Sequence, residues 1–161
     1  MEQQFVLFWK PQEANGIYSQ WYLCDMTIDG IVYCCNEQYM MAEKARLFGD
    51  VVVLAKIMAT RDPAEMRRLG RIVSGFNQQI WDDSCVGIVT DANYHKFSQN
   101  VDLRDQLLAT GNATIVEASP RDTIWGIGLG ASNPAARVPA SWRGKNLLGI
   151  AIMAARERIA A

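Results

Sequence analysis

The chain has 161 residues, half of them hydrophobic, and its 16 basic and 17 acidic side chains leave a net charge of −1. This length is enough for one domain with a real core. The balanced charge gives no overall basic excess of the kind that indicates nucleic-acid binding, although a local patch could still bind a phosphate. No apolar run approaches the roughly 18 residues of a membrane span, and the N-terminus lacks a signal-peptide pattern. We therefore expect a cytoplasmic protein, or a nuclear one in a eukaryote, with no membrane partner.

The four cysteines and the single histidine do not form a metal-ligand pattern. Cys34 and Cys35 are adjacent, which suits neither an ordinary disulfide nor a C-x-x-C zinc knuckle. His95 is the only histidine. We expect reduced and mostly buried thiols, no metal site and no cofactor.

The first third of the chain is β-like and then becomes helical. Gln4–Trp9 is a short apolar run, and Trp21–Cys35 has the pattern of a hairpin with its turn at Asp29-Gly30. An amphipathic helix follows, which we expect Asn36 to cap and Gly49 to end.

The middle of the chain is helical. The last strand and the last helix are separated by a long segment, 121–145, punctuated by Gly and Pro, and loops of that length are usually functional or disordered. The predicted elements are a helix at Val51–Ala59, a helix capped by Asp62 that stops near Gly70, one or two helices within Asn77–Asn100, a helix at Val101–Gly111, a strand at Ala113–Ser119 and a helix at Asn146–Ala161. The predicted class is α+β, mainly helical, with a small antiparallel sheet in a single domain covering residues 1–161.

Glu37 and Lys44 lie seven residues apart on the helix that follows the hairpin, so both leave it on nearly the same face. At the start of the helix, Glu37 faces free N–H groups and the positive end of the helix dipole, which favour an ionised carboxylate. Such a group can stabilise a developing cation or deprotonate water. A partly desolvated Lys44 would be a nucleophile. The alternatives are an ordinary first-turn glutamate and a solvated lysine.

Asp122 follows the last strand, where loops commonly hold catalytic carboxylates, although it could equally cap a short turn. Trp125 is either a stacking surface for a planar ring or a core residue. The glycines 126, 128 and 130 do not make a dinucleotide-binding fingerprint, because no helix follows them at the right place. Arg71 and Lys96 are candidate phosphate ligands, or else solvated cations.

Five motifs together give a more specific signal than any one of them: "EQYMMAEKARLFGD", "LGR", "KFSQN", "LLATGNATIVEASPRDTIWGIG" and "WRGKNLLGIAIMAARE". In order and spacing this set resembles the NADAR, or YbiA-like, family from about Phe5 to the C-terminus. The resemblance implies the YbiA-like fold and an N-glycosidase, which hydrolyses the bond between a base or amine and C1 of ribose.

The resemblance also implies two substrate classes. One is ADP-ribose attached to guanine in nucleic acid, and the other is the ribosylamino-pyrimidine phosphates of riboflavin biosynthesis. The Gly- and Pro-rich segment suggests a roomy cleft, so we favour ADP-ribosylated guanine, presented as a nucleotide-like molecule or as a single-stranded or flipped base. A binding module that recognises ADP-ribose without cleaving it, and a purely structural domain, are the alternatives.

The family's functional residues carry over onto matching positions of this chain. The implied catalytic residues are Glu37, Lys44 and Asp122, with a carboxylate stabilising an oxocarbenium-like state and Lys44 either attacking C1 or holding a charged group. The family's "F-S-N-F" segment reads "YSQW" here, with Gln20 in place of Asn. The substrate-binding residues that the resemblance implies are Tyr18, Ser19, Gln20, Trp21, Trp81 and Trp125. We expect Arg71, Lys96, Ser119 and Gly126 to contact the substrate as well.

Overall fold

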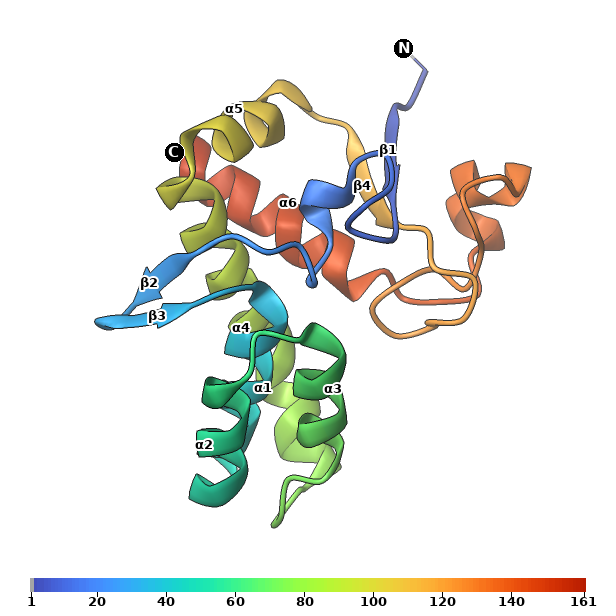
Figure 1. The fold of residues 1–161 in the computed structure, drawn as a ribbon. Helices are drawn as coiled ribbons and strands as arrows, with labels where there is room; N and C mark the ends of the chain where they lie inside the picture. The colour runs from blue at the N-terminus through green and yellow to red at the C-terminus, as the bar shows by residue number, and fades with distance from the viewer. Residues whose placement is uncertain (1) are drawn as a thin grey trace.

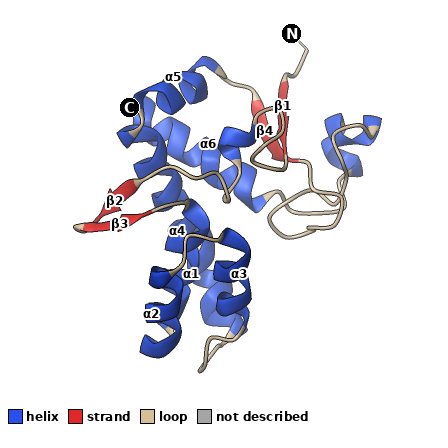
Figure 2. Ribbon diagram, viewed as in Figure 1, coloured by secondary structure: helices blue, strands red, loops and turns tan. Residues whose placement is uncertain are grey.

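A computed structural model describes residues 2–161, which form six α helices and four short strands (Figures 1 and 2). The predicted mainly helical α+β class with a small antiparallel sheet is confirmed. No helix among the described residues is long and apolar enough to cross a membrane. The elements are β1 (Phe5–Phe8), β2 (Met26–Ile28), β3 (Ile31–Tyr33), α1 (Asn36–Leu47), α2 (Val51–Ala59), α3 (Pro63–Arg71), α4 (Gln78–Gln99), α5 (Val101–Ala109), β4 (Thr114–Glu117) and α6 (Leu147–Ala160).

The predicted hairpin is present as β2 and β3, which pair antiparallel. Asp29 and Gly30 both have positive φ, 52° and 79°, as a two-residue turn of this kind requires. The regular strands are shorter than the predicted range of 21–35. Beyond them, the Cys24 N–H still donates to the Cys34 carbonyl at 3.0 Å, so the pairing continues as a single bond.

The strands β1 and β4 pair parallel, from Phe5 opposite Thr114 to Phe8 opposite Glu117. Helix α6 lies close against β4, and Gly149 makes this approach possible, because a Cβ there would be 2.1 Å from the Ile115 carbonyl oxygen. Ahead of α6, the Asn146 side chain donates to the Ile115 carbonyl and accepts from the Glu117 N–H, both at 3.0 Å. The Asn146 side chain thus hydrogen-bonds to the β4 backbone where a third strand would otherwise pair with it.

Helices α1, α2 and α3 pack on one another, and α1 packs against α4, which also lies against α6 (Figure 1). The pattern over 77–100 is therefore one long helix that joins the two parts of the molecule. Gly70 lets α3 approach α1 closely, because a Cβ at that position would overlap the Met41 side chain.

The start of α1 differs from the sequence prediction. Cys35, not Asn36, is the N-cap, and Asn36 is the first helical residue. The Asn36 amide is buried and donates to Asn93 on α4 at 2.9 Å and to Gln20 at 3.2 Å, because a buried amide must find partners inside the protein. The prediction for the other end is confirmed, since Gly49 follows the C-cap with φ of 73°.

Candidate active site

Glu37 lies in the first turn of α1 with only 7% of its surface exposed. Burial raises the pKa of its carboxyl to about 7, although the charges of Arg67, Lys44 and Arg71 act to lower it; Asp122 acts to raise it. Within residues 2–161 no backbone N–H donates to this carboxylate. The prediction of a firmly ionised Glu37 is therefore wrong, because the loss of solvent outweighs the helix dipole. The buried carboxyl can bind or release a proton near neutral pH.

Lys44 lies on the same face as Glu37, as the spacing predicted, and the two charges act on each other. Its Nζ atom is 4.7 Å from the ring centre of Phe76 and 5.3 Å from that of Trp81. Burial lowers the pKa of Lys44, Glu37 raises it and Arg71 lowers it further. Trp81 is only 8% exposed and carries the Lys44 amine near its ring, so it has little open face on which a base could stack.

Asp122 forms the turn that follows β4. Its Oδ1 atom accepts from the N–H groups of Ile124 at 2.9 Å and Trp125 at 2.8 Å, and its own N–H donates to the Ser119 hydroxyl at 3.2 Å. The capping role considered from the sequence is thus present, and it fixes the carboxylate. Its charge also acts on Glu37, so the aspartate is both a turn former and a neighbour of the buried glutamate.

Glu117 is a third carboxyl at the site, and the sequence did not single it out. Burial raises its pKa to about 8; Asp122 and Glu37 raise it further and Arg67 lowers it. Its Oε2 atom is buried and has no hydrogen-bond partner among residues 2–161. Glu117 is the last residue of an apolar strand that leads into the 121–145 segment. Catalytic carboxylates are common at strand ends, so Glu117 was by position as good a candidate as Asp122.

Lys96 does not face the candidate site. It is fully buried on α4, and its amine donates to the carbonyl oxygens of Ile17 and Ser19, the latter at 3.2 Å. Burial lowers its pKa to about 8. These contacts contradict the predicted phosphate contact, because the amine already bonds to buried carbonyls. Lys96 fixes the 17–21 segment, in which the Ser19 hydroxyl also accepts from the N–H of the half-buried Trp21 at 3.2 Å.

Tyr18 and Gln20, in the same 17–21 segment, make contacts with the core and with the start of α1. Tyr18 is buried and packs between Phe8 and Phe97, each at a ring-centre distance of 5.8 Å, which places it in the core. Tyr18 also lines a cavity beside β1, and its predicted substrate contact stays a prediction. The carbonyl oxygen of Gln20 accepts from the Glu37 N–H at 3.0 Å. Gln20 therefore braces the start of α1 beside the catalytic candidate.

Two arginines on α3 lie near the carboxyl groups without a salt bridge. Arg67 and Arg71 are exposed, stand one turn apart, and form no ion pair within the described residues. Both charges act on Glu37. Arg68, between them, is instead bound by Glu65 through two contacts of 2.6 and 2.8 Å. Arg71 lies where its charge acts on Glu37, and its predicted phosphate contact stays a prediction. Arg67 acts on Glu37 as well, although its surface position gave no signal in the sequence.

The segment that carries Asp122 is held by close backbone approaches. A Cβ on Gly126 would be 2.9 Å from the Glu117 carbonyl, and one on Gly144 would be 2.2 Å from the Gly126 carbonyl. Trp125 is half-buried and packs against the main core. Gly126 and the buried Ser119 thus shape the turn rather than offering an open surface.

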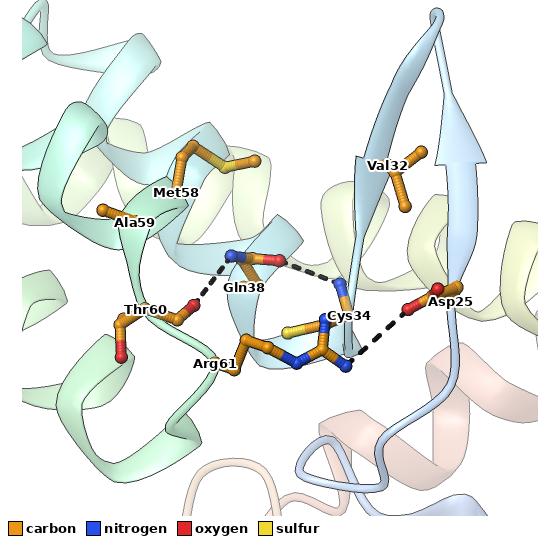
Figure 3. A pocket seen from close by; sticks show the side chains of 8 residues that line it. All are labelled: Asp25, Val32, Cys34, Gln38, Met58, Ala59, Thr60 and Arg61. Atoms are coloured by element: carbon orange, nitrogen blue, oxygen red, sulfur yellow. Dashed lines mark hydrogen bonds and ion pairs between the residues drawn. The ribbon is translucent and has the colours of Figure 1, made fainter.

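A small cavity of about 120 Å³ lies between the hairpin and the end of α2, and Figure 3 shows its lining. The Gln38 side chain crosses it, accepting from the Cys34 N–H at 2.8 Å and donating to the Thr60 carbonyl at 3.1 Å. Arg61 and Asp25 face each other at 4.0 Å across the same cavity. It contains none of the predicted site residues, and its bonds secure the first turn of α1. No group of three potential ligands among residues 2–161 is placed to hold a metal ion.

Comparison with known proteins gives one consistent family. The NADAR domain model matches residues 7–160. An N-glycosidase of Acanthamoeba polyphaga mimivirus is 49% identical over 154 residues, which cover 92% of this chain and 90% of the relative. A riboflavin biosynthesis protein of Vibrio vulnificus is 31% identical over 157 residues, which cover 98% of this chain and 39% of that protein. The NMR structure of the Escherichia coli protein YbiA matches with a TM-score of 0.81 at 28% identity, covering 99% of this chain and 87% of that one.

Proposed function

The chain belongs to the NADAR family of N-glycosidases, and from that premise we propose that it releases ADP-ribose from ADP-ribosylated guanine. The observation that carries this proposal is a group of three carboxyls that are buried or fixed by the fold. Glu37 is buried, the Glu117 Oε2 atom is buried without a partner among the described residues, and Asp122 is held by two backbone N–H groups. Their charges act on one another, and the charge of Glu37 also acts on Lys44. Cleavage of an N-glycosidic bond builds positive charge at C1 of the ribose and negative charge on the departing nitrogen. Groups that stabilise the cation and protonate the leaving nitrogen are both available here.

Glu117 is the proton donor in this proposal. With a pKa of about 8, its carboxyl keeps its proton at neutral pH, and its buried Oε2 atom is free of protein partners among the described residues. Glu37, whose pKa burial raises while the charges of Arg67, Lys44 and Arg71 lower it, is the group that stabilises the ribosyl cation. Two carboxyls whose environments differ in this way can divide the acid and base roles. Asp122, held by two backbone N–H groups, adds a fixed charge beside them.

Lys44 supplies the nucleophile. Its amine attacks C1 as the bond from C1 to the base nitrogen breaks, and the base leaves with the proton from Glu117. The ribose ring then opens to a Schiff base on Lys44, which water hydrolyses to free sugar and free amine. Borohydride added during turnover would reduce this intermediate to a stable adduct on Lys44, visible by mass spectrometry. Absence of the adduct, with near-normal turnover in Lys44→Ala, would remove the covalent role of Lys44.

The choice of ADP-ribose as the sugar rests on the arginines of α3. Arg67 and Arg71 offer two guanidinium groups without acidic partners in the described chain, and a diphosphate can use both. The neighbouring Arg68 is already bound by Glu65 and is the matched control. The net charge of −1 gives the protein no broad attraction for extended nucleic acid, so a terminal, single-stranded or flipped base is the proposed form of the substrate.

The test is a side-by-side assay of both substrate classes. Purified protein is incubated with a single-stranded oligonucleotide carrying ADP-ribosylguanine, and free ADP-ribose is measured against Glu37→Gln and Glu117→Gln. We expect release by the wild type and losses of about 10²–10⁴-fold in kcat for each variant, with the fold intact by circular dichroism. Binding of the oligonucleotide without release would instead identify a binding module. Normal turnover in a variant would remove that residue from the mechanism.

The second candidate function is hydrolysis of ribosylamino-pyrimidine phosphates, and the Vibrio vulnificus relative, named for riboflavin biosynthesis, favours it. That substrate carries one phosphate, so it needs one guanidinium group rather than two. Turnover of the pyrimidine phosphate with no release of ADP-ribose would establish this candidate and overturn the first.

A further inference from the structure

The short loop between α3 and α4 places an aromatic ring beside Lys44. The ring centre of Phe76 lies 4.7 Å from the Lys44 Nζ atom, and that of Trp81 lies 5.3 Å from it. We propose that Phe76 is a positioning residue, which together with Trp81 holds the Lys44 amine between two aromatic rings in the orientation and degree of hydration that its reaction needs. This inference rests on the proposed function only in taking Lys44 as a participant.

Phe76 is held in place although 42% of it is exposed. Its ring meets that of Phe48 edge-on at a centre distance of 5.3 Å and an angle of 66°. The Asp50 carboxylate accepts from the N–H of Ser74 at 2.9 Å and from its hydroxyl at 3.0 Å. Gly75 has φ of 73°, where a side chain would be strained. Three local constraints thus hold an exposed apolar ring with its centre 4.7 Å from the Lys44 amine.

The ring has two separable effects on the amine. Its face carries negative potential, which attracts the ammonium form, and its bulk keeps water away, which disfavours that form. The other charged groups that act on Lys44 are Glu37 on α1 and Arg71 on α3, and neither depends on Phe76. Substitutions at Phe76 therefore separate ring electrostatics from shielding while the charged neighbours stay unchanged.

The two effects predict different free-amine fractions of Lys44 in two variants. Phe76→Leu keeps most of the shielding but loses the aromatic face, so the free-amine fraction of Lys44 at neutral pH should rise about two- to fivefold. Phe76→Ala loses the shielding as well, so water reaches the amine and the free-amine fraction should fall below that of Phe76→Leu. Phe76→Tyr retains both ring and bulk and should match the wild type.

The measurement is reductive methylation of the intact protein with formaldehyde and cyanoborohydride. The rate at Lys44 is followed by peptide mass spectrometry from pH 7 to 11, and the midpoint of the profile reports the titration whatever the reagent's access. The exposed Lys56 on α2 is the internal reference. Ile72→Ala, an exposed apolar residue of the same loop, is the matched control and should leave the Lys44 midpoint unchanged.

Equal midpoints for Lys44 in the wild type, Phe76→Leu and Phe76→Ala would overturn the inference, as would an equal shift in Ile72→Ala. Because the reagent is not a substrate, the result does not depend on turnover. A failed glycosidase assay with shifted midpoints would refute the proposed function and leave the aromatic positioning of Lys44 intact. A normal glycosidase assay with unshifted midpoints would do the reverse.

Discussion

Replacement of Glu117 by glutamine should change how the stability of the folded protein depends on pH. Burial raises the pKa of Glu117 from 4.5 to about 8, so the folded state binds this proton more tightly than the unfolded state. The stabilisation that follows is complete below the ordinary pKa and is lost as the pH rises through about 8. A glutamine at this position has the same shape and no proton to lose.

The size of the effect follows from linkage. Between the two pKa values the folded state holds about one proton more than the unfolded state, so the free energy of unfolding falls by about 1.4 kcal/mol per pH unit. From pH 5.5 to 7.5 the wild type should lose roughly 2 to 3 kcal/mol that Glu117→Gln does not lose. With a urea m-value of about 2 kcal/mol/M, the midpoints should diverge by about 1.3 M over that range.

Urea titrations followed by tryptophan fluorescence at pH 5.5, 6.5 and 7.5 measure this divergence. Glu13→Gln, which replaces an exposed carboxylate, is the control and should follow the wild type at each pH. Glu37 remains in both proteins, and because its charge acts on Glu117, the comparison reports the titration of the pair with and without Glu117. Parallel curves for the wild type and Glu117→Gln would refute the account of Glu117 as a buried, protonated acid and remove its assigned role as proton donor.

Three further predictions concern the site and its support. Arg67→Ala should raise KM for a diphosphate-containing substrate about tenfold with little change in kcat, as loss of one charge-assisted contact implies, whereas Arg68→Ala should leave KM unchanged in the same kinetic assay. Lys96→Met should lower the melting temperature, measured by circular dichroism, because two buried carbonyls lose their donor; an unchanged melting temperature with a raised KM would instead restore Lys96 as a phosphate ligand. Gly149→Ala should destabilise the protein by about 3 kcal/mol or more in a urea titration, since a Cβ would overlap a β4 carbonyl; a loss below about 0.5 kcal/mol would contradict the close packing of α6.

Local sequence patterns were enough to place part of the site. The spacing of Glu37 and Lys44 fixed their common face, because helix geometry depends only on position along the chain. Asp122 was recognisable from the turn in which it lies, and the structure confirms its capping bonds. Asp29 and Gly30 identified the hairpin turn for the same reason, since positive φ favours these residue types.

The remaining features depend on contacts between distant segments, which local patterns do not encode. Glu117 and Lys96 are both charged residues, and each was understood only when burial and the neighbouring segments became visible. Lys96 bonds to carbonyls 77 and 79 residues away in the chain, so no window around it contains its partners. The position of Glu37 favoured the ionised form, but a dipole at a helix end is weaker than full burial, and burial is a tertiary property.

The parallel pairing of β1 with β4 has a consequence for how the chain folds. Phe5 at the start of β1 pairs with Thr114, so the first and the last of the four described strands pair, and Glu117 is the final residue of that pairing. Contacts of such large sequence separation form slowly, because a long loop must close before they contribute stability. During synthesis β1 therefore stays an unpaired apolar segment until most of the chain has left the ribosome, and the acid group of the site is assembled in the same late step.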